Sequence, residues 1–260
     1  MRTIVSLVCL AVGLAPQPQT LATGIIVHDL ASKGYDQRGS MQLKAVVTDD
    51  GSVAVAIVPA GAKQAPHHHE QEQVVLNLDG GQSFTIGEST YSLPPLTAAL
   101  PSSNTRHNYT VDTNGPATFI EYQPIRRDDY TPPFTGYTAV LTPEPVPAAK
   151  DLIGTRDLSA QSEGWQANGS ARTKELTGGQ CRIVMMDLRS PGAGIDVAPS
   201  PNGRQFLYVL SGQATLTAGG ANRQLSPHMV VEMTSASTPI RLQSVGAVPT
   251  LIAAFSRVRR

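Results

Sequence analysis

The sequence predicts an all-β protein in which one sandwich or barrel unit occurs twice. Beyond the N-terminal segment, apolar residues come in short runs bounded by Gly, Pro, Asn and Asp, a pattern typical of strands separated by turns. The 23 Gly and 20 Pro among 260 residues also indicate many turns. No long segment has helical periodicity, and an internal repeat indicates that one β unit occurs twice.

The N-terminal segment has the pattern of a secretory signal peptide. Arg2 provides a basic start, and residues 4–15 form an apolar run that is too short to span a bilayer. The small residue Ala22 predicts cleavage after it, with Ala15 as the alternative site, while a buried N-terminal strand or helix is the competing interpretation. We therefore expect residues 1–22 to be removed, leaving a secreted or periplasmic protein without a membrane segment.

The expected strands recur at turn-length spacing in both halves of the chain. They cover residues 53–58, 74–78, 118–122, 206–210, 229–231 and 250–252. The halves share landmarks at one constant offset, because the shift that aligns Gln73 with Gln205 also aligns Thr118 with Thr250. An offset that stays constant between such distant landmarks indicates a duplicated domain.

The duplication divides the rest of the chain into three parts. We expect an N-terminal domain over residues 23–125 and a C-terminal domain over residues 178–260. Residues 126–177 contain several prolines and are expected to form an extended surface connection, since proline fixes the backbone and has no N–H to donate.

A group of histidines in the first copy has the spacing of metal ligands. On an extended strand, residues two apart face the same side, so His67 and His69 project together and Gln73 keeps that parity. His107 follows a predicted hairpin that can return a strand alongside the first. Three imidazoles and one oxygen suit Fe, Mn, Ni, Zn or Cu and leave coordination positions open. These four residues therefore predict a site for one divalent metal ion.

This constellation resembles the first sequence motif of the cupins. The residues that carry the resemblance are Gly61, His67, His69, Gln73 and Gly80. The second cupin motif is matched less well around His107, because Pro101 stands one place early and Asn104 replaces the usual glycine. The resemblance covers about residues 40–125 and 178–256 and implies a two-domain cupin. It implies two double-stranded β-helix (jelly-roll) barrels, with the metal inside the wide end of the first.

One departure from the family pattern concerns the fourth ligand. Most metal cupins have Glu where this chain has Gln73, and the neighbouring Glu72 would need a bulge to point inward. We therefore favour Gln73 as the ligand, and its neutral amide leaves more positive charge on the metal for polarising a substrate oxygen. Tyr109 and Glu72 are the candidate catalytic residues, the alternatives being a core position for Tyr109 and a solvent-facing position for Glu72.

The second copy is expected to lack a metal site. At the offset that relates the two copies, the three histidine positions fall on prolines and only the glutamine is kept: Pro199, Pro201, Pro239 and Gln205. Proline has no ligating side chain. We therefore expect the C-terminal barrel to be structural.

These features predict a secreted metal-dependent enzyme that acts on a small, oxygen-rich substrate. The resemblance implies either an isomerase, lyase or hydrolase, or a dioxygenase of the flavonol-cleaving kind, and the missing ligand carboxylate favours the first group. The alternative is a non-catalytic binding or storage protein, as many two-domain cupins are.

Charge and cysteine content limit the other partners. The 20 basic and 20 acidic side chains give a formal net charge of zero, which argues against nucleic acid as a partner. Removal of the signal peptide would leave Cys181 as the one cysteine, so no internal disulfide is expected. Cupins commonly pair through sheet edges, so the resemblance also implies a homodimer.

Overall fold

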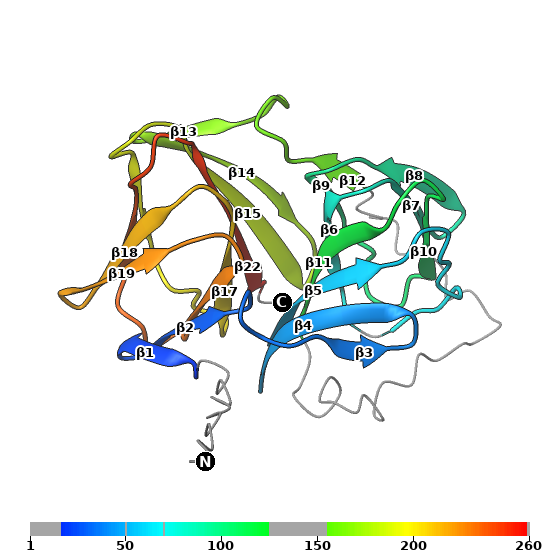
Figure 1. Cartoon of the computed structure of the whole chain (residues 1–260), viewed down its shortest axis with the longest axis horizontal. Helices are drawn as coiled ribbons and strands as arrows, with labels where there is room; N and C mark the ends of the chain where they lie inside the picture. The colour runs from blue at the N-terminus through cyan, green and yellow to red at the C-terminus, as the bar shows by residue number, and fades with distance from the viewer. Residues whose placement is uncertain (1–16, 50, 70, 125–154, 259–260) are drawn as a thin grey trace, which may run out of the picture.

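The two halves of the chain form two β barrels that lie side by side (Figure 1). The computed structural model describes residues 17–49, 51–69, 71–124 and 155–258. These residues form strands, turns and bends without a helix, which confirms the all-β prediction. Accordingly, the described part of the chain has no helix long and apolar enough to cross a membrane.

The first half contributes short strands, most of them hairpin partners of their chain neighbours. They are β1 (Gln19–Ala22), β2 (Ile25–Asp29), β3 (Asp36–Arg38), β4 (Met41–Thr48), β5 (Gly51–Val58), β6 (Val74–Asp79), β7 (Gln82–Ile86), β8 (Ser89–Leu93), β9 (Thr97–Ala99), β10 (His107–Val111) and β11 (Ala117–Gln123). On β7, buried and partly exposed side chains alternate, as expected for a strand with one face on a core.

The second half repeats this series. Its strands are β12 (Thr155–Asp157), β13 (Gln166–Asn168), β14 (Ala171–Thr177), β15 (Cys181–Leu188), β16 (Gly194–Val197), β17 (Gln205–Ser211), β18 (Ala214–Ala218), β19 (Ala221–Leu225), β20 (Met229–Met233), β21 (Ile240–Ser244) and β22 (Thr250–Arg257). The offset that aligns Gln73 with Gln205 also aligns the start of the hairpin β7–β8 with the start of the hairpin β18–β19. The sequence repeat is therefore a repeat of the fold.

Each barrel is closed by a large sheet and a small sheet. In the N-terminal barrel the seven-stranded sheet has the order β12-β9-β6-β11-β5-β4-β3, and the small sheet has the order β10-β7-β8. In the C-terminal barrel the orders are β1-β2-β20-β17-β22-β15-β14-β13 and β16-β21-β18-β19. Corresponding strands of the two copies occupy corresponding places, as expected for two tandem jelly-roll barrels.

The two halves exchange strands, which differs from the expected domain division. In the C-terminal barrel, β2 pairs with β20, and in the N-terminal barrel β12 pairs with β9. Residues 25–29, expected in the first domain, thus complete the second barrel, and residues 155–157, expected in the connection, complete the first. Strands β13 and β14, also expected in the connection, belong to the C-terminal sheet. The physical reason is that β9 and β20 would otherwise leave an unpaired edge.

The expected signal peptide and connection lie largely outside the described residues. Residues 1–16 and 125–154 are not described, and these include the prolines of the connection. Residues 19–22 form β1, which pairs with β2. Cleavage after Ala22 would remove β1 and leave β2 in place.

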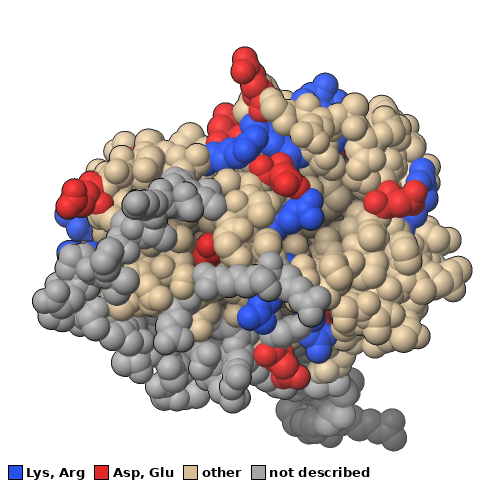
Figure 2. Space-filling view, turned by 180° about the vertical axis from the view of Figure 1, so that it is seen from behind, with Lys and Arg blue, Asp and Glu red and all other residues tan. Residues whose placement is uncertain are grey.

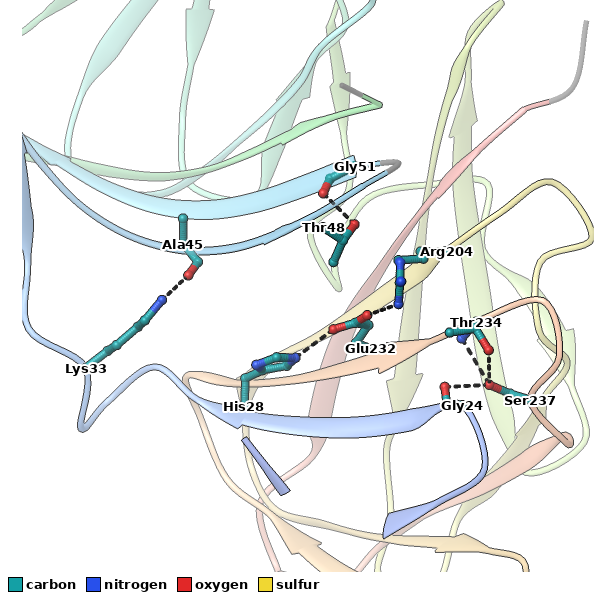
Figure 3. A network of polar contacts seen from close by, with 10 residues as sticks. All are labelled: Gly24, His28, Lys33, Ala45, Thr48, Gly51, Arg204, Glu232, Thr234 and Ser237. Atoms are coloured by element: carbon teal, nitrogen blue, oxygen red, sulfur yellow. Dashed lines mark hydrogen bonds and ion pairs between the residues drawn. The ribbon is translucent and has the colours of Figure 1, made fainter. Parts of the chain in front are cut away.

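A buried carboxylate links strand β2 to the C-terminal barrel (Figure 3). The Glu232 side chain on β20 lies 2.8 Å from Nε2 of His28 on β2, and its other oxygen contacts the Arg204 guanidinium. Nearby, Lys33 donates a hydrogen bond to the carbonyl of Ala45 on β4. The segment after β1 is thus bound to both barrels.

Among the described residues the apolar core has three parts, one inside each barrel and one between them. The cluster between the barrels joins residues of β5, β6 and β11 to residues of β15, β17 and β22. Tyr122 and Phe255 stack there with ring centroids 5.8 Å apart, and each such buried ring contributes roughly 1.5–3 kcal/mol. Because side chains alternate along β11, Ile120 and Tyr122 face this interface while Phe119 faces the N-terminal barrel interior. β11 is therefore a wall shared by the interface and the interior.

Charged side chains are sparse on the face seen from behind (Figure 2). Lys and Arg stand close to Asp and Glu there, and most of the described surface is uncharged. This mixed distribution agrees with the formal net charge of zero.

Candidate metal centre

Three histidines converge at one end of the N-terminal barrel. One ligand nitrogen from each of His67, His69 and His107 lies within 4.8 Å of the others. His67 and His107 are joined by an isolated β-bridge, with backbone N–H to O distances of 2.8 and 3.0 Å in the two directions. His69 is two residues further along the extended segment, so it faces the same side as His67. The structure thus brings together the three histidines that the sequence predicted.

Hydrogen bonds fix which nitrogen of each ring faces the centre. The Nδ1 atoms of His67, His69 and His107 lie 3.1, 2.5 and 2.7 Å from backbone carbonyl oxygens of Ala65, Gln71 and Thr105. A carbonyl oxygen only accepts, so each Nδ1 carries the proton and each Nε2 presents a lone pair. This is the arrangement by which ligating histidines are usually oriented.

Not all of these lone pairs meet a donor: the Gln123 amide lies 3.5 Å from Nε2 of His69, but no donor reaches the His107 nitrogen. Nε2 of His107 is buried and has no hydrogen-bond partner, which is costly in a folded protein. The Gln73 Oε1 lies 3.2 Å from Nε2 of His69, which places two acceptor atoms side by side at the start of β6. A cation shared by these atoms would satisfy them all, so the residues present fit a metal ion. Gln73 therefore stands where the sequence placed the fourth ligand.

Burial keeps the three imidazoles neutral. Removal from water lowers the pKa of His67 to about 4, with smaller contributions from neighbouring charges. The same cause lowers the pKa of His69 and holds the pKa of His107 well below its ordinary value. Neutral imidazoles are the form that binds a metal, so the ligand set is ready at neutral pH.

A cavity of about 220 Å³ opens beside the histidines. His67 and Gln73 lie in its wall, and Tyr109 lines it as the parity with His107 predicted. Burial, followed by the negative charge of Glu121, raises the pKa of Tyr109 above its ordinary value. The phenol therefore stays protonated at neutral pH and offers an O–H donor to the cavity.

Sequence reasoning missed two residues of this cavity, Glu121 and Gln123. Both lie on the inner face of β11, following Phe119 at two-residue spacing, and both are buried. The Gln123 amide nitrogen lies 3.5 Å from Nε2 of His69, and its oxygen is buried without a partner. The sequence contains the pattern that identifies these two residues. If the expected strand 118–122 is extended by one residue, residues 119, 121 and 123 lie on the same face of it.

Glu72, a candidate catalytic residue, does not lie beside the histidines. It is buried, does not line the cavity, and points toward the turn between β14 and β15. Its carboxylate accepts backbone N–H bonds from Gly179 at 2.8 Å and Cys181 at 2.9 Å, and also from Gln180. A carboxylate held by three amides in the other barrel cannot serve as acid or base at the histidines, so this expectation is corrected. The reason is the strand parity that turns Gln73 inward and Glu72 outward.

The C-terminal barrel has no histidine cluster of this kind among its described residues. Strand pairing sets Val197 opposite Ile240, just as the bridge sets His67 opposite His107. The positions that correspond to these two histidines are therefore buried aliphatic residues, not the prolines that a constant offset indicated. Small length differences between the copies shift the correspondence, but the expected loss of the ligand set remains.

Comparisons with known proteins agree with this fold. A family model described as the AraC-like ligand binding domain matches residues 59–127. A comparison with curated proteins finds no match. Among solved structures, a glyoxylate-induced protein from Pseudomonas aeruginosa aligns with a TM-score of 0.73 and 12% identity over 95% of this chain and 92% of that one.

Two further solved structures resemble the whole double barrel. AerE from Microcystis aeruginosa aligns with a TM-score of 0.64 and 14% identity over 87% of this chain and 98% of that chain. Oxalate decarboxylase from Bacillus subtilis aligns with a TM-score of 0.63 and 12% identity over 90% and 77% of the two chains. At these identities the likeness concerns the fold, and that fold is the two-domain cupin fold.

Proposed function

We propose that the protein is a secreted, metal-dependent enzyme that acts on a small, oxygen-rich acid in the N-terminal barrel. The observation that carries the proposal is Glu121, a buried carboxylate in the wall of the cavity that also contains His67 and Gln73. A protein that only carries a metal has no need of an acid beside the ligands. Proton transfer to or from a bound substrate needs a proton donor or acceptor beside the metal, and a buried carboxyl group can serve as one.

The donor set favours a metal that acts through its charge. His67, His69 and His107 would hold it with three neutral nitrogens, and Gln73 with an amide oxygen. Bound there, a divalent ion supplies Lewis-acid polarisation of a substrate oxygen. Because none of the four donors carries a negative charge, this donor set supports isomerase, lyase or hydrolase chemistry over the dioxygenase alternative.

Cations in the cavity wall support an acidic substrate. Arg38 and Lys63 line the cavity, and the positive charge of Arg38 contributes to lowering the pKa of His67. A carboxylate would be attracted to these side chains, and the volume of about 220 Å³ restricts the substrate to a small molecule.

The remaining polar groups of the cavity have defined tasks. We assign to Glu121 the transfer of a proton to or from the substrate. Tyr109, whose raised pKa keeps its hydroxyl protonated, donates a hydrogen bond to a substrate oxygen. The buried ring of Tyr109 packs against Phe119, with centroids 5.5 Å apart, so the hydroxyl is held in position.

The test is a turnover screen on the metal-loaded protein. Oxalate and glyoxylate come first, because solved structures with this fold include an oxalate decarboxylase and a glyoxylate-induced protein. Sugar acids and ureides follow, and an oxygen electrode tests the dioxygenase alternative. For the substrate found, Glu121→Gln is expected to lower kcat by roughly 10²–10⁴-fold with the metal content unchanged. The exposed Glu88 offers the control variant Glu88→Gln, which should keep full activity.

Two results would contradict the enzyme proposal. One is a tightly bound metal with no turnover of any acid in the screen, and the other is full activity in the Glu121→Gln variant. The first would favour the binding or storage alternative. Secretion is tested separately by N-terminal sequencing of the protein from its native host, with residue 23 expected as the first residue.

A further inference from the structure

The C-terminal barrel has a cavity of its own at the corresponding end. Its volume is about 600 Å³, against about 220 Å³ in the N-terminal barrel. Strand pairing places Gln205 and Ser256 in its wall opposite each other, where the first barrel has Gln73 and Gln123. Ala254 takes the place of Glu121, and this smaller side chain leaves more room.

The lining excludes a metal as the occupant. Among the residues that line this cavity there is no histidine, cysteine or aspartate, and the one carboxylate is that of Glu175. Glu175 is already paired with Arg182, at an N–O distance of 2.5 Å. A single paired carboxylate does not make a cation site, so the cavity calls for an organic ligand.

Two polar side chains in the wall make no hydrogen bond to other described residues. In the described part of the chain, the Gln205 amide and the Ser256 hydroxyl make no side-chain hydrogen bond, although Ser256 is only 9% exposed. Neither polar group is closed off from solvent, so a ligand in the cavity could replace the water around it. They lie on the paired strands β17 and β22, which hold them in fixed positions.

The charges in the wall favour an anion. Arg182 and Arg257 stand against one acid, Glu175, so the lining carries one net positive charge. The Arg182–Glu175 pair is about half exposed, at 46% and 53%, and such pairs contribute little energy that a ligand must overcome. Among the described residues, Arg257 has no carboxylate partner.

Part of the wall is apolar and stiff, although Thr177, Ser200 and Asn202 also line it. Val184, Ala198 and Ala254 line it together with Pro199 and Pro201, whose rings restrict the backbone. An apolar surface beside two guanidinium groups suits a molecule with a carboxylate on a small apolar or aromatic body. We propose that the C-terminal barrel contains a second, metal-free binding site for a small organic carboxylate of this kind.

The test compares benzoate with benzamide, which has nearly the same shape and no charge. Binding of each is measured by isothermal titration calorimetry on the full-length protein. The His67→Ala/His69→Ala variant is measured alongside, to separate this site from the N-terminal cavity. Benzoate is expected to bind the wild type and this variant equally, and benzamide to bind roughly tenfold more weakly or not at all.

Two independent variants locate the binding. Arg182→Gln/Arg257→Gln removes both cations, and Ser256→Leu fills the cavity, so each should weaken benzoate binding by roughly tenfold or more. Arg241→Gln is the matched control, because Arg241 is 49% exposed and paired with an exposed aspartate as Arg182 is with a glutamate. Thermal melting checks that each variant is folded. No benzoate binding to the wild type, or equal binding to all folded variants, would overturn the proposal.

Discussion

Corresponding strands have the same order in the two barrels, but the side chains at the two open ends differ. In the N-terminal barrel the bridged positions are His67 and His107, and in the C-terminal barrel the paired residues Val197 and Ile240 occupy them. Both pairs are buried. The aliphatic pair joins the core of its barrel, while the histidines are turned toward a shared centre by backbone carbonyls.

This difference shows that the barrel does not depend on the metal ligands for its fold. Burying Val and Ile stabilises the second barrel by roughly 1.5–3 kcal/mol for each side chain. Imidazoles at the same places leave the His107 Nε2 buried and unsatisfied. A site that weakens the core in this way is typical of a function added to a scaffold that is stable without it.

The largest expected difference between the barrels is in metal content. The His67→Ala/His69→Ala variant should fall from about one metal ion per chain to none, because it removes two of the three converging nitrogens. Gln205→Ala, at the position that corresponds to Gln73, should leave the metal content unchanged. Elemental analysis of the purified proteins measures both. Metal retained by the histidine variant would place the ion outside this centre.

The sequence predicts the fold and much of this centre, because both depend on local patterns. Alternation along strands puts His67, His69 and Gln73 on one side, and the constant offset between the halves reveals the duplication. The exchange of β2 and β12 between the halves was not predictable in this way. It depends on edge-to-edge pairing between residues that are far apart in the chain, such as Ile25 and Met233.

Other details depended on small shifts of register. A constant offset places the second-copy equivalent of His107 at Pro239, whereas strand pairing places it at Ile240. The apolar run 118–122 predicts a strand, but it does not by itself show that Glu121 faces the barrel interior. The carboxylate of Glu72 and its place next to Gln73 suggest a role in the site, but its parity along the chain turns it away from the histidines.

The second expected effect concerns the contact between the barrels. Glu72→Ala should lower the free energy of unfolding by roughly 2–4 kcal/mol, because it leaves the buried backbone N–H of Cys181 without an acceptor and also removes the bond from Gly179. Glu175→Ala, which removes an exposed carboxylate from its pair with Arg182, should change it by less than about 1 kcal/mol. Urea unfolding curves measure both. If Glu72→Ala and Glu175→Ala lower the free energy of unfolding equally, the Glu72 contacts do not hold the barrels together.

The smallest expected effect is that of removing the Tyr109 hydroxyl, which should lower activity without changing stability. Pairing between β10 and β7 places Tyr109 opposite Phe84, and the corresponding pairing in the second barrel places Leu242 opposite Leu216. An apolar residue therefore suffices for folding at this place, so Tyr109→Phe should leave the melting temperature unchanged. If the hydroxyl donates to a substrate oxygen, kcat should fall by roughly tenfold, the loss expected for one neutral hydrogen bond. KM should change less than kcat if that bond strengthens as charge develops on the oxygen. A lower melting temperature with unchanged kcat would instead make Tyr109 a packing residue, as Leu242 is at the corresponding place in the second barrel.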